Sequence, residues 1–198
     1  MLHRKNRVRV NVTPGFLLLV GMLLYLDQKI GILIWGILAS VFHELGHILA
    51  ARHFGGRGEV LSLSVTGAEL KFSYPAILSY GAESLIALAG PAVNLLIGII
   101  SLCLKSPLFA MTNIMIGLFN LSPILPLDGG RILFNLVCEW ADVSVSEHVM
   151  SACAGIFIGI LFGVGLIAAV HYANIILLIL AGWLLAGTMR KQNIFSPK

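Results

Sequence analysis

His43-Glu44-Leu45-Gly46-His47 lies in the middle of an apolar stretch, Ile30 to Ala51, in which Glu44 is the only residue with a formal charge. A helix of this length is long enough to cross about 30 Å of hydrocarbon. A carboxylate and two imidazoles at that depth cost free energy unless something compensates them. The stretch therefore predicts a membrane-spanning helix that carries a functional site.

The spacing of the two histidines predicts a metal site on that helix. Residues four apart share one helical face, so the imidazoles of His43 and His47 are expected to lie together. Two such imidazoles can hold a zinc ion, and a Glu beside the first can act as a base in hydrolysis. The alternative is an ordinary surface Glu44, and the apolar surroundings argue against it.

The composition is that of an integral membrane protein. Of the 198 residues, 58% are hydrophobic and 11% are charged, and the mean hydropathy is +0.95. Soluble domains are about 25% charged. The three cysteines form no CxxC pair, so we expect buried free thiols in place of a disulfide framework.

Charged residues and histidines divide the chain into six expected membrane spans. The first is short, from about Pro14 to Leu26 with an extension over Val8 to Val12, and we interpret it as a retained segment. The other five are Ile30–Ala51, Ser84–Leu104, Ser106–Leu127 with a helical continuation to Cys138, Val149–Val170 and Tyr172–Met189. The predicted fold class is an all-α integral membrane protein of six transmembrane helices, with a small membrane-associated β-hairpin after the second helix.

The hairpin is expected between the second and third spans. Apolar and polar residues alternate over Leu61–Val65 and again over Leu70–Phe72, on either side of Gly67. This period of two with a Thr-Gly break predicts two antiparallel strands. An edge strand there could pair with an extended peptide. A hairpin that only covers the helix ends is an equally good interpretation.

Lysine and arginine predict the orientation. With the N-terminus inside, 11 of the 13 basic residues fall on the cytoplasmic side, and only Lys29 and Lys105 fall outside. The positive-inside rule therefore predicts both termini in the cytoplasm. These residues anchor the chain against anionic headgroups, which explains the net charge of +4 without a nucleic-acid partner.

Asp128 is the expected third metal ligand. Catalytic zinc sites combine three protein ligands with an open position. Asp128 follows Pro123 and Pro126, which break a helix because proline lacks an amide donor. Broken backbone at membrane depth lies beside protein or water. Under the predicted topology, His47 and Asp128 both lie near the cytoplasmic side, as a shared metal requires.

The third predicted span contains Gly90-Pro91-Ala92-Val93-Asn94. Glycine and proline allow close helix approach or a kink, and Asn94 is a polar group in hydrocarbon that needs a partner. From the residues alone, a packing role for Asn94 is the default interpretation.

Together, the motifs His43–His47, Gly90–Asn94, Asn120–Pro123 and Pro126–Gly129 resemble the site-2 protease family of intramembrane zinc metalloproteases, over about residues 10 to 190. The resemblance implies zinc as the cofactor, with three ligands and a catalytic base: His43, His47 and Asp128 as ligands, and Glu44 as the base. It also implies that Asn94 and Asn120 lie near the site, where they help to hold the substrate or the oxyanion.

Six spans without a PDZ insertion are similar to the sporulation branch of that family, stage IV sporulation protein FB, which cleaves a membrane-associated precursor of a sigma factor. We expect a single polytopic protease domain over residues 1–198, in the bacterial cell membrane, without the C-terminal CBS domain of many branch members. Expected partners are a membrane-protein substrate, the lipid bilayer and, as an additional candidate, a membrane regulator subunit; no nucleic acid is expected.

Two other functions share part of the pattern. A zinc-binding membrane transporter would use the ligands but would not need Glu44, and transporters usually show repeated halves, of which the sequence shows none. A non-catalytic membrane scaffold would have lost a ligand or the Glu, and all of them are present.

Overall fold

The structure is a computed structural model that describes residues 9–14, 32–64 and 67–195 of the chain. The chain is mostly helical and divides into two compact units. Unit 1 comprises residues 1–82 and 89–118, and unit 2 comprises residues 83–88 and 119–198.

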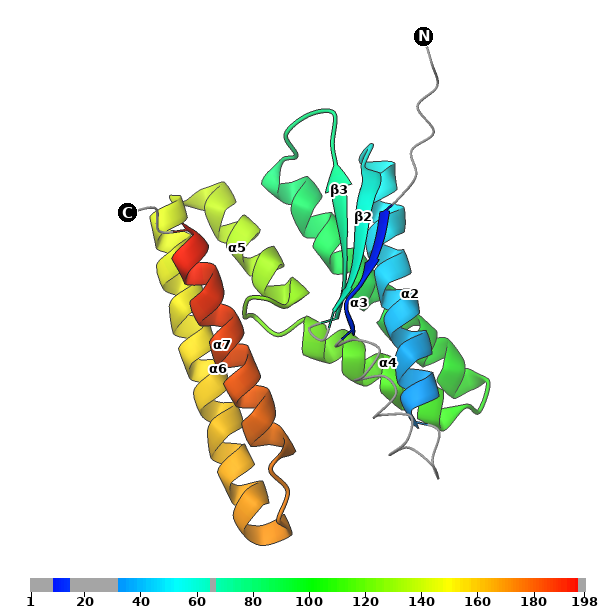
Figure 1. The fold of residues 1–198 in the computed structure, drawn as a ribbon, viewed down its shortest axis with the longest axis vertical. Helices are drawn as coiled ribbons and strands as arrows, with labels where there is room; N and C mark the ends of the chain where they lie inside the picture. Colours follow the sequence, from blue (N-terminus) through cyan, green and yellow to red (C-terminus); the bar gives the residue numbers. More distant parts are fainter. Residues whose placement is uncertain (1–8, 15–31, 65–66, 196–198) are drawn as a thin grey trace. The chain divides into compact units, whose positions relative to one another are not determined.

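A three-stranded sheet belongs to unit 1, so the mostly helical chain has one strand, β1, in addition to the predicted hairpin. Strand β2 (Arg57–Ser64) pairs antiparallel with β3 (Gly67–Ser73) and parallel with β1 (Arg9–Val12), in the order β1-β2-β3 (Figure 1). The β2/β3 pair is the predicted hairpin, whereas its association with a membrane stays a prediction. Strand β1 was expected to extend the first span. Its alternating valines, Val10 and Val12, favour an extended strand because β-branched side chains pack well on a sheet.

Helix α2 (Ile32–His53) carries the histidine motif and lies against β2 and β3 (Figure 1). Its described part begins at Ile32, and the helix ends two residues after the predicted span. The chain leaves the helix through Gly55, whose φ of 80° is a left-handed conformation that glycine adopts without strain. Most of the first predicted span falls on residues 15–31, which lie outside the described part of the chain.

Helix α3 (Tyr80–Cys103) packs closely on α2 within unit 1. It begins at Ser79, whose side-chain oxygen accepts a hydrogen bond from the Ala82 amide. A Cβ atom at Gly46 of α2 would lie only 2.6 Å from the Ala89 carbonyl oxygen and 3.0 Å from the Gly90 Cα atom. Small residues let membrane helices approach in this way. The α2–α3 contact therefore depends on a missing side chain inside the histidine motif.

Helix α4 (Pro107–Asn120) completes the helical part of unit 1. Phe109 packs on Trp35 of α2 with ring centroids 5.1 Å apart. A Cβ atom at Gly98 of α3 would lie 2.6 Å from the Ile114 side chain. The helix ends at Asn120, earlier than the predicted Leu127, because Pro123 and Pro126 cannot continue it.

Unit 2 is built around helices α5 (Asp128–Trp140), α6 (Val143–Tyr172) and α7 (Ile176–Phe195). Helices α6 and α7 lie side by side, yellow to red in Figure 1. Residue Ala173, with φ of 50°, turns the chain between them. The core of the unit contains buried apolar side chains from the segment before α5 and from helices α6 and α7: Ile124, Leu127, Ala154 and Leu184.

Three of the described helices, α2, α3 and α6, are long and apolar enough to cross a membrane. Helix α4 and the Ile176–Met189 part of α7 are shorter apolar helices. The helical continuation expected up to Cys138 is present as the separate helix α5. The full count of six membrane-spanning helices stays a prediction.

The close contact at Gly46 leads to a test of the packing of unit 1. We expect Gly46→Ala to lower the free energy of unfolding by about 1–3 kcal/mol, because the added methyl group must push the α3 backbone away. The measurement is the thermal midpoint of the purified protein in detergent. Gly36→Ala on the same helix is the control, since a Cβ there meets nothing within 4 Å. Equal midpoints for the two variants would contradict the packing described here.

Candidate metal centre

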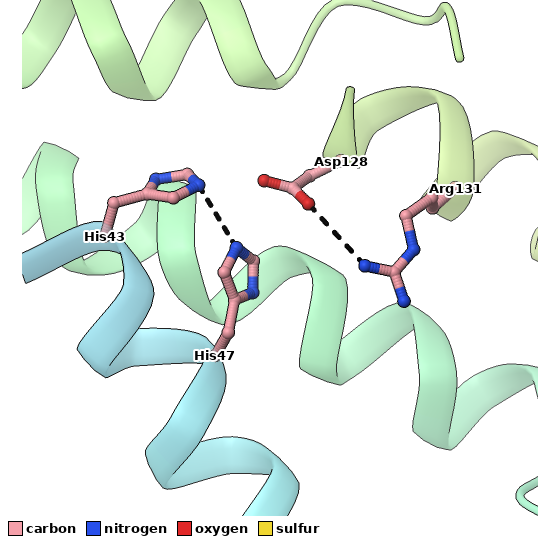
Figure 2. A network of polar contacts seen from close by, with 4 residues as sticks. All are labelled: His43, His47, Asp128 and Arg131. Atoms are coloured by element: carbon pink, nitrogen blue, oxygen red, sulfur yellow. Dashed lines mark hydrogen bonds and ion pairs between the residues drawn. The ribbon is translucent and has the colours of Figure 1, made fainter. Parts of the chain in front are cut away.

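The two histidines of α2 present their nitrogens to the same point. The Nε2 atoms of His43 and His47 are 3.1 Å apart, and the rings meet edge to face with centroids 4.7 Å apart (Figure 2). Two nitrogen ligands of a tetrahedral zinc ion, each at about 2.0–2.1 Å, are themselves about 3.3 Å apart. The two nitrogens could therefore occupy two coordination positions of one zinc ion with little movement.

The position of the His47 ring depends on a glycine of the neighbouring helix. A Cβ atom at Gly90 of α3 would lie against His47 Nε2 and 2.6 Å from its Cε1 atom. His43 is 7% exposed and His47 is partly buried. The His47 imidazole thus lies against α3, and the room for it exists because residue 90 has no side chain.

Glu44 follows His43 on α2 and is partly buried. It is the chain neighbour of the first histidine, the position at which the motif predicts a base for metal-assisted hydrolysis.

Asp128 is the first residue of α5 and belongs to unit 2. It is 8% exposed, and its Oδ1 atom lies 4.0 Å from Nη1 of Arg131 one turn later (Figure 2). A carboxylate in the first turn is also stabilised by the positive end of the helix dipole. Arg131 was not singled out as a site residue from the sequence, although its spacing of three from Asp128 is a readable signal.

Two glycines hold the start of α5 against the preceding loop. A Cβ atom at Gly129 would lie against the Leu121 backbone and 2.6 Å from the Ser122 carbonyl oxygen. A Cβ atom at Gly130 would lie against the Ile124 backbone. This close approach, made possible by the absence of side chains, fixes Asp128 at the end of the broken segment that follows α4.

His43 and His47 of unit 1 and Asp128 of unit 2 are residue types that could hold a metal ion. Two imidazole nitrogens and one carboxylate oxygen are the donor set of many hydrolytic zinc sites, which keep a fourth position open for water. The residue types present therefore fit zinc.

The two asparagines expected near the site belong to different units of the structure, and each is described in its own unit. Asn94 of α3 is fully buried in unit 1, and its Nδ2 atom donates a hydrogen bond to the Ala39 carbonyl oxygen of α2, at 3.2 Å. Asn120 is the last residue of α4, is partly buried and belongs to unit 2. Sequence reasoning did not identify Asn113, a second fully buried asparagine, whose amide donates to Phe109 within its own helix.

Comparisons with known proteins support a family for this chain. A family model described as peptidase family M50 matches residues 106–166. The zinc metalloprotease MJ0392 of Methanocaldococcus jannaschii is 32% identical over 137 residues, which cover 60% of this chain and 39% of that protein. The putative zinc metalloprotease Rip3 of Mycobacterium tuberculosis is 30% identical over 176 residues, which cover 79% of this chain and 44% of that protein. The chain spans less than half the length of these curated relatives.

A solved structure has a similar fold. The site-2 protease from Methanocaldococcus jannaschii aligns with a TM-score of 0.68 at 24% sequence identity, over 100% of this chain and 96% of that chain. Fold, family model and relatives together support the class of membrane metalloproteases. The family model and the relatives support peptidase family M50, the solved structure shows that the fold is similar to that of a site-2 protease, and the sporulation branch stays a prediction.

The glycine beside His47 offers a test of the metal centre. We expect Gly90→Ala to lower zinc affinity by about 10–100-fold, because the methyl group displaces the His47 ring. Zinc retained per chain is measured after dialysis against a competing chelator, together with the thermal midpoint. Gly81→Ala on the same helix is the control, since a Cβ there meets nothing within 4 Å. A folded Gly90→Ala protein with wild-type zinc affinity would refute this role of residue 90.

Proposed function

We propose that the chain is an intramembrane zinc metalloendopeptidase that hydrolyses a peptide bond of a membrane-associated protein near the cytoplasmic side. The observation that carries the proposal is the pair of Nε2 atoms 3.1 Å apart, with Glu44 between the two histidines on an apolar helix. The M50 match and the relatives named zinc metalloproteases support the same chemistry.

In this proposal His43 and His47 bind the metal through Nε2, and Asp128 supplies the third ligand. The chemistry that zinc supplies when bound is polarisation of the scissile carbonyl and acidification of a water molecule. Glu44 takes the proton of that water and later passes it to the leaving amine. Arg131 lies on one side of the Asp128 carboxylate and keeps it oriented.

The substrate that fits this site is a membrane protein with a locally unwound segment. A helical backbone shields its own carbonyls, so the segment must open before hydrolysis. Strand β3 lies at an edge of the sheet and could pair with such an extended segment. Asn120, at the end of α4, is the residue that we assign to substrate binding. The specific substrate that we propose is a precursor of a sigma factor.

The proposed setting is a bacterial cell membrane with both termini in the cytoplasm. The supporting pattern is the concentration of lysine and arginine on one side of the predicted spans. In this setting residues 1–198 act as one polytopic protease domain, and a membrane regulator subunit is a compatible partner.

Glu44→Gln tests the assigned base. We expect the variant to keep zinc and to lose at least about 100-fold of the cleavage rate, because the amide cannot accept the proton of the water. Membrane proteins that accumulate in cells producing the variant are identified by quantitative mass spectrometry, and the strongest candidate is co-expressed as the substrate. Glu139→Gln, at an exposed position of α5, is the matched control. Wild-type cleavage by Glu44→Gln would rule out this base.

Asp128→Asn tests the third ligand. A neutral amide is a weaker zinc ligand than a carboxylate, so we expect lower zinc content and lower activity together. Elemental analysis of the purified protein measures the metal. Asp142→Asn is the control, because Asp142 is an exposed aspartate beside the start of α6. Unchanged zinc in Asp128→Asn would remove Asp128 from the ligand set.

A further inference from the structure

On the basis of the zinc site proposed above, we infer that Asn94 is a positioning residue for the turn of α2 that carries His43 and His47. This turn is called the histidine turn below. Its side-chain amide holds the Ala39 carbonyl oxygen, at 3.2 Å, from the neighbouring helix. Ala39 lies one turn before His43, and both Asn94 and Ala39 are fully buried. Asn94 thereby sets the direction in which the two imidazoles present their Nε2 atoms.

The hydrogen bond reaches the backbone that supports His43. In an α-helix the amide of residue i bonds to the carbonyl of residue i−4, so the Ala39 carbonyl is the helical acceptor for the His43 amide. The same oxygen therefore receives a bond from α3 and supports the turn that carries the first histidine. A shift of α3 is passed directly to that turn.

Three contacts with α3 bracket the histidine turn from both ends. Asn94 holds Ala39 before it, the Ala89 carbonyl approaches Gly46 within it, and Gly90 borders the His47 ring after it. The two contacts after His43 are steric and act by excluding atoms. The contact before His43 is a directed hydrogen bond, so it sets the rotation of the helix about its own axis as well as its distance.

The surroundings of Asn94 argue against direct contact with a substrate. The side chain is fully buried, and one of its two amide N–H groups donates to the Ala39 carbonyl oxygen. Its Oδ1 atom accepts no hydrogen bond in the part of the chain that the structure describes. A carbonyl-type oxygen repels an oxyanion and cannot stabilise it. Asn94 therefore acts through α2.

Because the Asn94 Oδ1 atom has no partner among the described residues, an effect of Asn94 on the position of the histidines can be distinguished from an effect on the stability of the fold. A buried polar atom without a partner destabilises the folded state, so an apolar residue of similar size at position 94 removes that cost. The Ala39 carbonyl keeps its bond within α2. Asn94→Leu is thus expected to leave the fold at least as stable while releasing the histidine turn.

Asn113 is a matched control within the same unit. It is also fully buried, and its Oδ1 atom likewise has no partner among the described residues. Its amide, however, donates to Phe109 of its own helix at 2.9 Å and links no second helix. Asn113→Leu makes the same chemical change without cutting a bond between helices.

The experiment uses the purified full chain without substrate. Zinc affinity is measured by competition with a chelator, and cobalt is substituted for zinc so that its visible absorption reports the geometry of the ligands. We expect Asn94→Leu to weaken zinc binding by about tenfold or more and to change the cobalt spectrum. Its metal-free thermal midpoint should equal or exceed that of the wild type. Asn113→Leu should leave zinc affinity and the cobalt spectrum unchanged.

Several outcomes would overturn the role of Asn94. Wild-type zinc affinity and an unchanged cobalt spectrum in Asn94→Leu would do so, and a loss of cleavage in that case would indicate direct substrate contact. An equal loss of affinity in Asn113→Leu would show a general packing effect. If Asn94→Leu does not fold, Asn94→Ala removes the amide without added bulk, and unchanged affinity there overturns the role. A wild-type protein that binds no zinc refutes the proposed function itself.

Discussion

The close approach of α2 and α3 is the constraint on which the rest of the site depends. Gly46 and Gly90 leave no side chain between the two backbones, so the imidazole of His47 fits against α3 and the two Nε2 atoms converge. Polar side chains in an apolar helix are tolerated where their cost is compensated. In the proposed site, a metal ion bound by both imidazoles would supply that compensation, so helix packing and metal binding would depend on the same turn of α2.

The carboxylate ligand that we propose, Asp128, follows a break in a helix. Proline residues stop α4 at Asn120, and the chain starts again at Asp128 as α5. A carboxylate at a helix start gains from the exposed amides and the dipole of that helix. Imidazoles can be presented from the middle of a continuous helix because they are long and neutral. A short, charged side chain gains more from a helix end. This difference explains why the two histidines lie in the middle of α2 whereas Asp128 is the first residue of α5.

Local patterns were readable in the sequence, and contacts between distant segments were not. The spacing of His43 and His47 and the alternation around Gly67 depend on neighbours in the chain, and both predicted elements are present. Strand β1 was assigned to the first span because its alternation is only four residues long and precedes an apolar run. The early end of α4 was missed because apolar residues continue between the prolines. Nothing near Asn94 in sequence identifies Ala39, 55 residues away, as its partner.

The two fully buried asparagines, Asn94 and Asn113, show why a helix is positioned better by a bond from a neighbouring helix than by a bond within itself. Asn113 bonds to the carbonyl one turn earlier in its own helix, which is the usual choice for a short polar side chain within an apolar helix. Such a bond moves with its helix and cannot fix where that helix lies. Asn94 donates across to α2, so its bond changes length whenever the two helices slide or rotate. A metal site whose ligand nitrogens must stay about 3 Å apart needs this second kind of bond, and in this fold the neighbouring helix provides it.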